Sequence, residues 1–164
     1  KEKFPNAYEY LLAHKEILLK RDKGKKKYEN WYAFGRTQGI KNLFGKKILT
    51  PSISKYPIFI YCDKETALFY AGYGIFNPPY EFEIMEKILN SSVIGEYIFI
   101  ISKPYRDNWR AYSKIFLEKI RIPILNKDEI EKLRMLSKKE EIDEFVLWLY
   151  KRRKTGKIFA SKLF

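Results

Sequence analysis

Residues 31–39 hold the side chains best suited to bind a polyanion. They read Trp-Tyr-Ala-Phe-Gly-Arg-Thr-Gln-Gly, so that Arg36, Thr37 and Gln38 stand between two glycines. Arginine binds phosphates and guanine edges bidentately, glutamine pairs with an adenine edge, and threonine binds phosphate oxygens. Lys41 follows the segment and is expected to contact DNA together with these three residues. The pattern predicts a loop that contacts nucleic acid; the alternative is that Arg36 closes the loop through a structural ion pair.

A second set of basic, aromatic and amide side chains is concentrated between residues 103 and 112. We expect DNA contacts from six of them: Lys103, Tyr105, Arg106, Asn108, Trp109 and Arg110. Such a mixture suits phosphate binding together with entry into a groove of DNA. The alternative is a solvated turn whose two aromatic rings pack inwards.

The net charge of the chain is +13, and most of the excess is near its beginning. The first 50 residues hold 13 basic and 5 acidic side chains, whereas the numbers are nearly equal from residue 51 to residue 153. A localised positive field favours a polyanion such as nucleic acid. We expect sequence-independent phosphate contacts from a run of four lysines, Lys23, Lys25, Lys26 and Lys27. The alternative is a solvated, lysine-rich surface.

Several classes of protein are excluded by composition. The single cysteine, Cys62, excludes an internal disulfide, and the single histidine, His14, offers no zinc site. No apolar run approaches the roughly 20 residues that span a bilayer. We therefore expect a cytoplasmic protein with no metal, no cofactor of its own and no membrane segment. Because the chain begins at Lys1 without a methionine, we expect a piece of a longer polypeptide. Cys62 is expected in a buried strand and His14 on a helix surface.

The elements that must position these side chains show helix patterns and, between residues 47 and 72, a succession of strand patterns. Asn6 with Glu9 resembles a capping box for a helix to about Lys20, and Ser137 with Glu140 resembles one for a helix through Tyr150. Further helices are expected at 82–90, after Pro78 and Pro79, and at 128–135; strands are expected at 47–50, 56–62 and 67–72. Residues 93–101 fit either class.

This order of elements predicts an α+β fold. We expect one small domain with a mixed, mostly antiparallel sheet flanked by helices, followed by a C-terminal helical segment. Residues 1–125 would form the recognition domain. Residues 126–164 would form a helical extension that packs on it or on a separate catalytic domain.

The tetrapeptide Asn77-Pro78-Pro79-Tyr80 matches the catalytic motif of adenine-N6 DNA methyltransferases, which bind a flipped-out adenine. Residues 70–74 resemble the glycine loop that binds S-adenosylmethionine in those enzymes. In that fold several βα units separate the two motifs, whereas only Ile75 and Phe76 lie between them here. We therefore interpret the tetrapeptide as a loop before a helix, and predict no catalytic residue in this chain.

Six segments, in order, resemble the TaqI-like C-terminal specificity domain of adenine-N6 methyltransferases. They are Tyr8-Glu9-Tyr10-Leu11-Leu12, Trp31-Tyr32-Ala33-Phe34-Gly35-Arg36-Thr37-Gln38, Lys47-Ile48-Leu49-Thr50-Pro51, Leu89-Asn90-Ser91, Ser102-Lys103-Pro104-Tyr105-Arg106 and Ile120-Arg121-Ile122-Pro123. Together they span residues 4–125. Two features depart from the family: Asp107-Asn108-Trp109 stands where glycines often follow Pro-Tyr-Arg, and Asn77-Pro78-Pro79-Tyr80 occupies a variable loop.

The resemblance implies a division of labour. This chain would bind double-stranded DNA and read its sequence, while a methyltransferase domain of the same polypeptide would methylate adenine with S-adenosylmethionine. The parent would be an adenine-specific enzyme of a type II restriction-modification system, most typically a fused type IIG enzyme. Two alternatives stay open: adenine methylation by this chain at Asn77 and Tyr80, and a generic basic RNA-binding domain.

Overall fold

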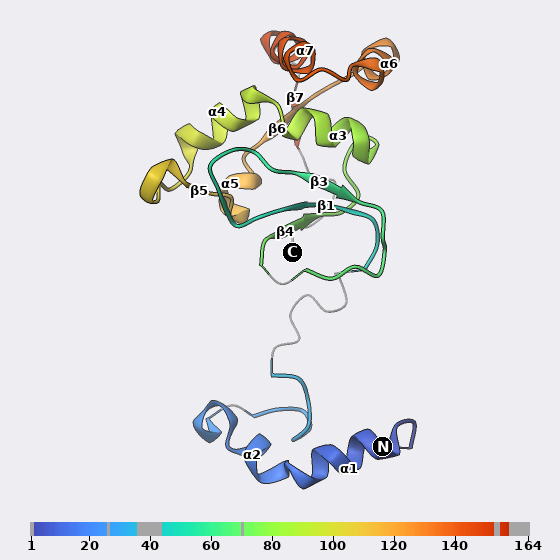
Figure 1. Cartoon of the computed structure of the whole chain (residues 1–164), viewed down its shortest axis with the longest axis vertical. Coiled ribbons are helices and arrows are strands. Elements are labelled where there is room, and N and C mark those ends of the chain that lie inside the picture. Colours follow the sequence, from blue (N-terminus) through green and yellow to red (C-terminus); the bar gives the residue numbers. More distant parts are fainter. Residues whose placement is uncertain (1, 26, 36–43, 70, 153–154, 158–164) are drawn as a thin grey trace. The chain divides into compact units, whose positions relative to one another are not determined.

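The computed structural model describes residues 2–25, 27–35, 44–69, 71–152 and the backbone of 155–157. The chain forms two compact units, Lys1–Gln38 and Gly39–Phe164. Figure 1 traces both, and each is considered by itself.

The N-terminal unit consists of short helices: α1 (Pro5–Ala13), α2 (Lys15–Leu19) and the 3-10 turn η1 (Arg21–Gly24). The predicted cap at Asn6 is wrong, because α1 begins one residue earlier, at a proline whose missing N–H costs nothing in the first turn. His14 separates α1 from α2 and lies exposed, as predicted. None of the described residues of this unit is buried, so these residues do not form a buried hydrophobic core.

The C-terminal unit is built around an antiparallel sheet in the order β3-β1-β4. Its strands are β1 (Lys47–Thr50), β3 (Ile60–Cys62) and β4 (Tyr73–Ile75), with Ile48 opposite both Tyr61 and Ile75. Helix α3 (Phe82–Leu89) covers one face of this sheet (Figure 1). The predicted strand at 67–72 is wrong. Gly72 turns the chain at φ +128°, with its Cα so close to the Thr50 carbonyl oxygen that a Cβ would lie 2.5 Å from it.

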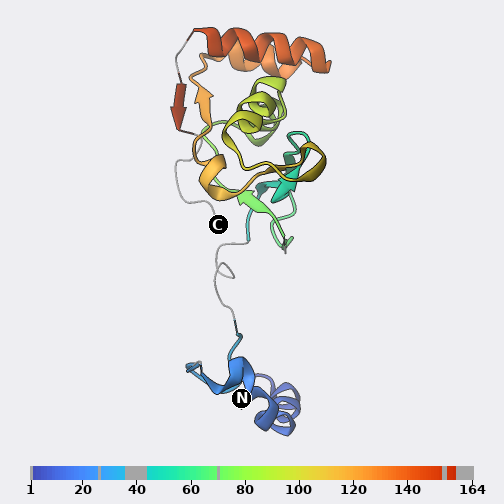
Figure 2. The ribbon, with the colours of Figure 1, turned by 90° about the vertical axis from the view of Figure 1, so that its left-hand side faces the viewer.

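Two short ribbons join the remaining elements. Strand β2 (Ile53–Ser54) pairs with β5 (Arg110–Ala111). Strand β6 (Arg121–Pro123) pairs with β7 (Thr155–Lys157), and these two strands lie side by side in Figure 2. The ambiguous segment 93–101 is helical and belongs to α4 (Ser92–Ile101). The 3-10 turn η3 (Arg106–Asn108) and helix α5 (Lys114–Leu117) lie on either side of β5 in sequence.

Helices α6 (Lys127–Met135) and α7 (Lys139–Lys151) pack against α3, and α7 also packs against α4. Asn126 and Glu129 form a capping box at the start of α6. The predicted box at Ser137 is wrong: the N-cap of α7 is Lys138, with no side-chain cap. The apolar stripe of α7 is buried in the core of this unit, beside α3 and α4: Ile142, Phe145, Val146 and Leu149. The predicted division at residue 125 stays a prediction.

The α+β class is confirmed, and all the strand pairs described are antiparallel. Cys62 lies on β3 as predicted, but it is half-exposed rather than buried, because β3 is an edge strand. In the described part of the chain no helix is both long and apolar enough to cross a membrane.

Candidate nucleic-acid interface

The loop from Lys103 to Arg110 is held in shape by its own backbone. The Tyr105 N–H donates to the Trp109 carbonyl at 2.8 Å, and the Trp109 N–H donates to the Arg106 carbonyl at 3.1 Å. At the tip, Asp107 and Asn108 have φ values of 54° and 62°, in the left-handed region that aspartate and asparagine tolerate better than most residues. Asp107 and Asn108 therefore form a left-handed turn at the tip of the loop.

Most of the predicted contact side chains of this loop point into solvent. Lys103, Arg106 and Asn108 are exposed, and so are the rings of Tyr105 and Trp109, at 47% and 41%. The alternative in which these two rings pack inwards is therefore wrong. The exposed combination of two cations, an amide and two aromatic rings suits contact with phosphates and groove walls.

Arg110 differs from its neighbours in this loop. Its guanidinium carbon lies 3.7 Å from the centre of the Phe99 ring, and its Nε is buried without a hydrogen-bond partner in the described structure. Strand pairing of Arg110 with Ser54 places the loop beside the segment that follows β2. Arg110 is thus half-buried and packs on Phe99 of α4, and its predicted contact with DNA stays a prediction.

The pairing of β2 with β5 brings two further residues to this surface. The Lys55 ammonium lies 6.0 Å from the centre of the Trp109 ring, and Tyr56 is 72% exposed. Sequence reasoning missed both residues. The adjacent lysine and tyrosine are visible in the sequence, but only the pairing of β2 with β5 places Lys55 next to Trp109, 54 positions later. We call Lys55, Tyr56 and the loop 103–110 the candidate interface.

The other predicted contacts belong to the N-terminal unit or to segments outside the described residues. Arg36, Thr37, Gln38, Lys41 and Lys26 all lie outside the described residues. Lys23, Lys25 and Lys27 are exposed in the N-terminal unit, as a phosphate-attracting surface requires.

The aromatic segment before Arg36 is organised by Arg21. Its guanidinium donates to the carbonyls of Ala33 at 2.9 Å and Trp31 at 2.8 Å. The Trp31 ring packs edge-on against Tyr8 and Tyr32. The rings of Tyr8, Trp31 and Tyr32 therefore pack together without being buried, and Phe34 is 76% exposed within its unit.

The tetrapeptide 77–80 has a structural role in the C-terminal unit. The Tyr80 hydroxyl donates to the Pro123 carbonyl at 3.2 Å and accepts from the Leu125 N–H at 2.8 Å. Gly74, the last residue of the apparent glycine loop, pairs with Leu49 inside the sheet instead of forming an open turn. These contacts fasten Tyr80 to the end of β6 and to the segment after it.

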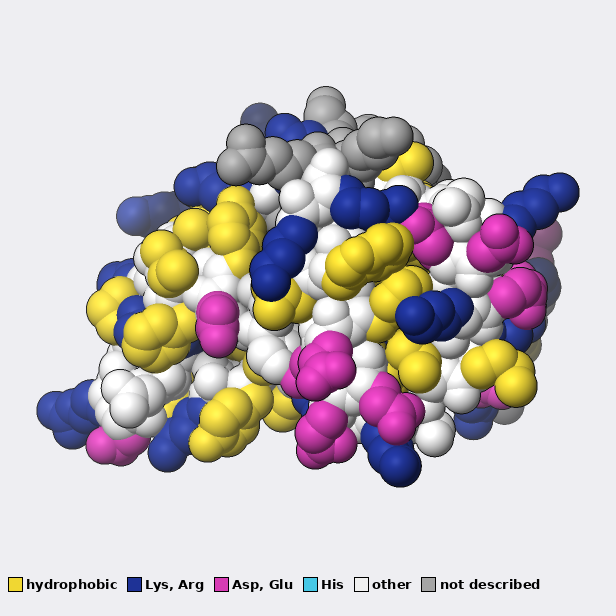
Figure 3. Space-filling model, turned by 90° about the horizontal axis from the view of Figure 1, so that it is seen from above, with side chains coloured by type: hydrophobic (Ala, Val, Ile, Leu, Met, Phe, Trp, Pro, Cys, Tyr) yellow, Lys and Arg dark blue, Asp and Glu magenta, His cyan; other side chains and the backbone are white. Residues whose placement is uncertain are grey.

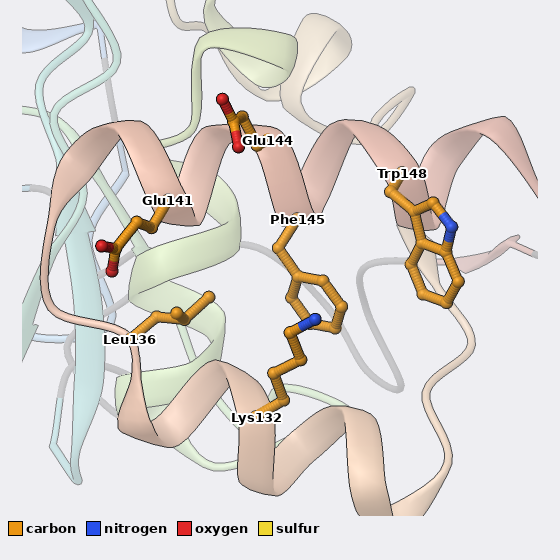
Figure 4. Close-up of a pocket in the computed structure, with 6 residues that line it drawn as sticks. All are labelled: Lys132, Leu136, Glu141, Glu144, Phe145 and Trp148. Atoms are coloured by element: carbon orange, nitrogen blue, oxygen red, sulfur yellow. The ribbon is translucent and has the colours of Figure 1, made fainter.

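A cavity of about 380 Å³ lies between α6 and α7 (Figure 4). Its floor is the stacked pair Phe145 and Trp148, and Glu141 and Glu144 line it together with Lys132. The face that includes these helices carries acidic, basic and apolar side chains intermixed (Figure 3). Carboxylates at the opening disfavour a phosphate backbone, so we place the candidate interface at the loop 103–110 and not here.

No family model matches the chain. Two curated proteins are similar to it. The type II methyltransferase M.MjaIV of Methanocaldococcus jannaschii is 30% identical over 143 residues, which cover 84% of this chain and 48% of that protein. The type II methyltransferase M.BstVI of Geobacillus stearothermophilus is 27% identical over 161 residues, which cover 93% of this chain and 28% of that protein. The chain is related to type II methyltransferases. It spans about half the length of the first relative and less of the second.

Proposed function

We propose that this chain is the sequence-recognition part of a site-specific adenine-N6 DNA methyltransferase from a type II restriction-modification system. It binds duplex DNA and positions it for a catalytic domain in the same polypeptide. The observation that carries the proposal is the candidate interface, where exposed cations, an amide and aromatic rings share one surface.

The chemistry of the interface matches the parts of a DNA duplex. Lys103 and Arg106 are exposed cations that neutralise phosphates, and each phosphate contact releases counterions. Tyr105 and Trp109 provide flat surfaces for sugars or groove walls, and Asn108 provides an amide for a base edge. Lys55 adds a third cation beside Trp109.

The comparisons support a role apart from catalysis. The matched region covers nearly all of this chain but only part of each relative, which leaves room in those proteins for a catalytic domain elsewhere. S-adenosylmethionine would bind in that domain. The hydrogen bonds of Tyr80 to Pro123 and Leu125 support the same assignment, because they commit its hydroxyl to the fold.

The test is binding of the chain to labelled duplex DNA, first to a random-sequence pool and then to duplexes selected from it. Arg106→Ala should weaken binding to the selected duplex by about tenfold, or about 1.4 kcal/mol. Arg36→Ala, at the other predicted loop, should do the same. Lys103→Ala should reduce the slope of log affinity against log salt by about one. The matched control is Lys127→Ala, an exposed lysine at the start of α6.

Three results would overturn the proposal. The first is unchanged affinity in both arginine variants with a folded protein. The second is binding of S-adenosylmethionine by this chain, which would favour methylation at Asn77 and Tyr80. The third is a preference for RNA without sequence discrimination, which would indicate a generic RNA-binding domain.

A further inference from the structure

A groove of about 660 Å³ lies directly beside the candidate interface. One wall is the segment Lys55, Tyr56 and Pro57 after β2, another is α4, and the tip of the loop 103–110 closes an end. Gly95 allows the first wall to approach the helix, since a Cβ at this position would lie 3.0 Å from Pro57 Cδ. The groove is thus built from three segments that are distant in sequence.

The inner surface of the groove is largely apolar and aromatic. Tyr56 is 72% exposed, Phe99 on α4 is 46% exposed, and Ile100 is 79% exposed. Exposed rings next to a basic surface are the usual platform on which unstacked bases are held, and each such stacking contact contributes about 1–3 kcal/mol.

The charges that line the groove differ from those of the surrounding loop. Two carboxylates, Glu96 and Asp107, line it with one ammonium group, Lys55, which lies over the Trp109 ring. The net charge of these three side chains is negative and repels a phosphate backbone. Lys103, which lies outside the groove, attracts one. An ionised carboxylate only accepts hydrogen bonds, so the groove suits a ligand that donates them.

We propose that the groove binds one nucleobase that has left the DNA stack, and that it prefers a base with an exocyclic amino group. Adenine, cytosine and guanine each carry such a donor, whereas thymine has none. A stacked base presents only its edge and cannot enter a concave site, so the base must be extruded, which costs a few kcal/mol in a paired duplex and less at an unpaired position. Tyr56 would stack on the base, and Glu96, Asp107 and Asn108 would bind its polar edge.

This inference rests on the proposed function, and its test separates the two. The chain is titrated into labelled duplexes of one sequence that are fully paired or carry a single-nucleotide bulge of adenine, cytosine, guanine, thymine or an abasic residue. The abasic bulge reproduces the flexibility of the duplex without the base. We expect the adenine, cytosine and guanine bulges to bind at least fivefold more tightly than the thymine and abasic bulges.

Two variants assign the preference to the groove. Tyr56→Ala should remove the preference for a base over the abasic bulge, and Glu96→Gln should remove discrimination between amino-bearing bases and thymine. Matched controls are Met135→Ala and Glu140→Gln, exposed residues of α6 and α7, and these should leave both preferences intact. Thermal unfolding of each variant verifies that it is folded.

Each outcome is decisive. Equal affinity for all five bulges, with the paired duplex still bound, would overturn the base site and leave the proposed function standing. A preference that persists in both groove variants would place the base elsewhere and also overturn it. Failure to bind any of these DNAs at low salt would overturn the proposed function and this inference together.

Discussion

Lys87 joins two helices by a cluster of hydrogen bonds whose removal has a calculable effect. Its ammonium group donates to three carbonyl oxygens at the end of α6: Leu133 at 2.9 Å, Arg134 at 2.8 Å and Leu136 at 2.7 Å. These carbonyls have no partner further along α6, and they carry the negative end of the helix dipole. All three protons of one lysine are thereby used to hold α6 on α3.

We expect Lys87→Met to lower the free energy of unfolding by about 2–3 kcal/mol. Hydrogen bonds to a charged group contribute about 1.5–3 kcal/mol each when buried, but Lys87 is only half-buried and water can replace part of what is lost. At a typical urea m-value the unfolding midpoint should fall by about 1–2 M. Lys87→Arg should recover only part of the loss, because a planar guanidinium cannot direct its protons at all three carbonyls.

The measurement is urea unfolding followed by circular dichroism. Lys64→Met, at an exposed loop lysine, is the matched control and should change the free energy of unfolding by less than about 0.5 kcal/mol. A loss in Lys87→Met no larger than that of the control would refute the reasoning. Full stability in Lys87→Arg would show that charge alone, and not the three-carbonyl geometry, matters.

Three further predictions concern single side chains of the C-terminal unit. Burial raises the pKa of the Asp143 carboxyl, but hydrogen bonds from Lys139 and Ser92 outweigh burial and lower the pKa. The ionised carboxylate therefore stabilises the fold above about pH 4, and this stabilisation is lost as the pH falls through the folded-state pKa. Asp143→Asn should flatten the decline in the free energy of unfolding between pH 5 and 3, roughly the range in which carboxylates titrate. Burial raises the pKa of Tyr112 to about 12, so its contribution is present below pH 10 and is lost as pH rises towards that value; ultraviolet titration of Tyr112→Phe should show one fewer late-ionising tyrosine. Tyr80→Phe should cost about 1–2 kcal/mol in urea unfolding and leave duplex affinity unchanged, whereas a loss of affinity without a loss of stability would contradict its structural role.

Local patterns in the sequence were informative wherever neighbouring residues determine structure. The helix at 82–90 and the strand at 47–50 were predicted because their apolar spacing and flanking residues act within a few positions. The exposed, basic and aromatic nature of the loop 103–110 was likewise visible from its composition. The contacts of the loop around Arg36, which lies outside the described residues, stay a prediction from its residue types.

Caps and strand ends were less predictable, because they depend on which neighbour approaches. Both sequence-based capping boxes, at Asn6 and Ser137, were wrong, while the one at Asn126 exists in the structure. Strand β4 begins after Gly72 because this glycine approaches the Thr50 carbonyl too closely for any side chain. A capping residue caps a helix only if the helix starts directly after it, and tertiary packing helps to decide where a helix starts. The spacing of residue types alone does not give that position.

By itself, the sequence determined the α+β class, the positive charge and the side chains available for contact with DNA, because these follow from composition and short-range periodicity. Only the tertiary structure decided which of them share a surface. Pairing of β2 with β5 brought Lys55 and Tyr56 to the loop 103–110, and the fold placed the Arg110 guanidinium against Phe99 of α4. The reason is physical: strand pairing and close packing join residues far apart in the chain, and no local pattern encodes the partner.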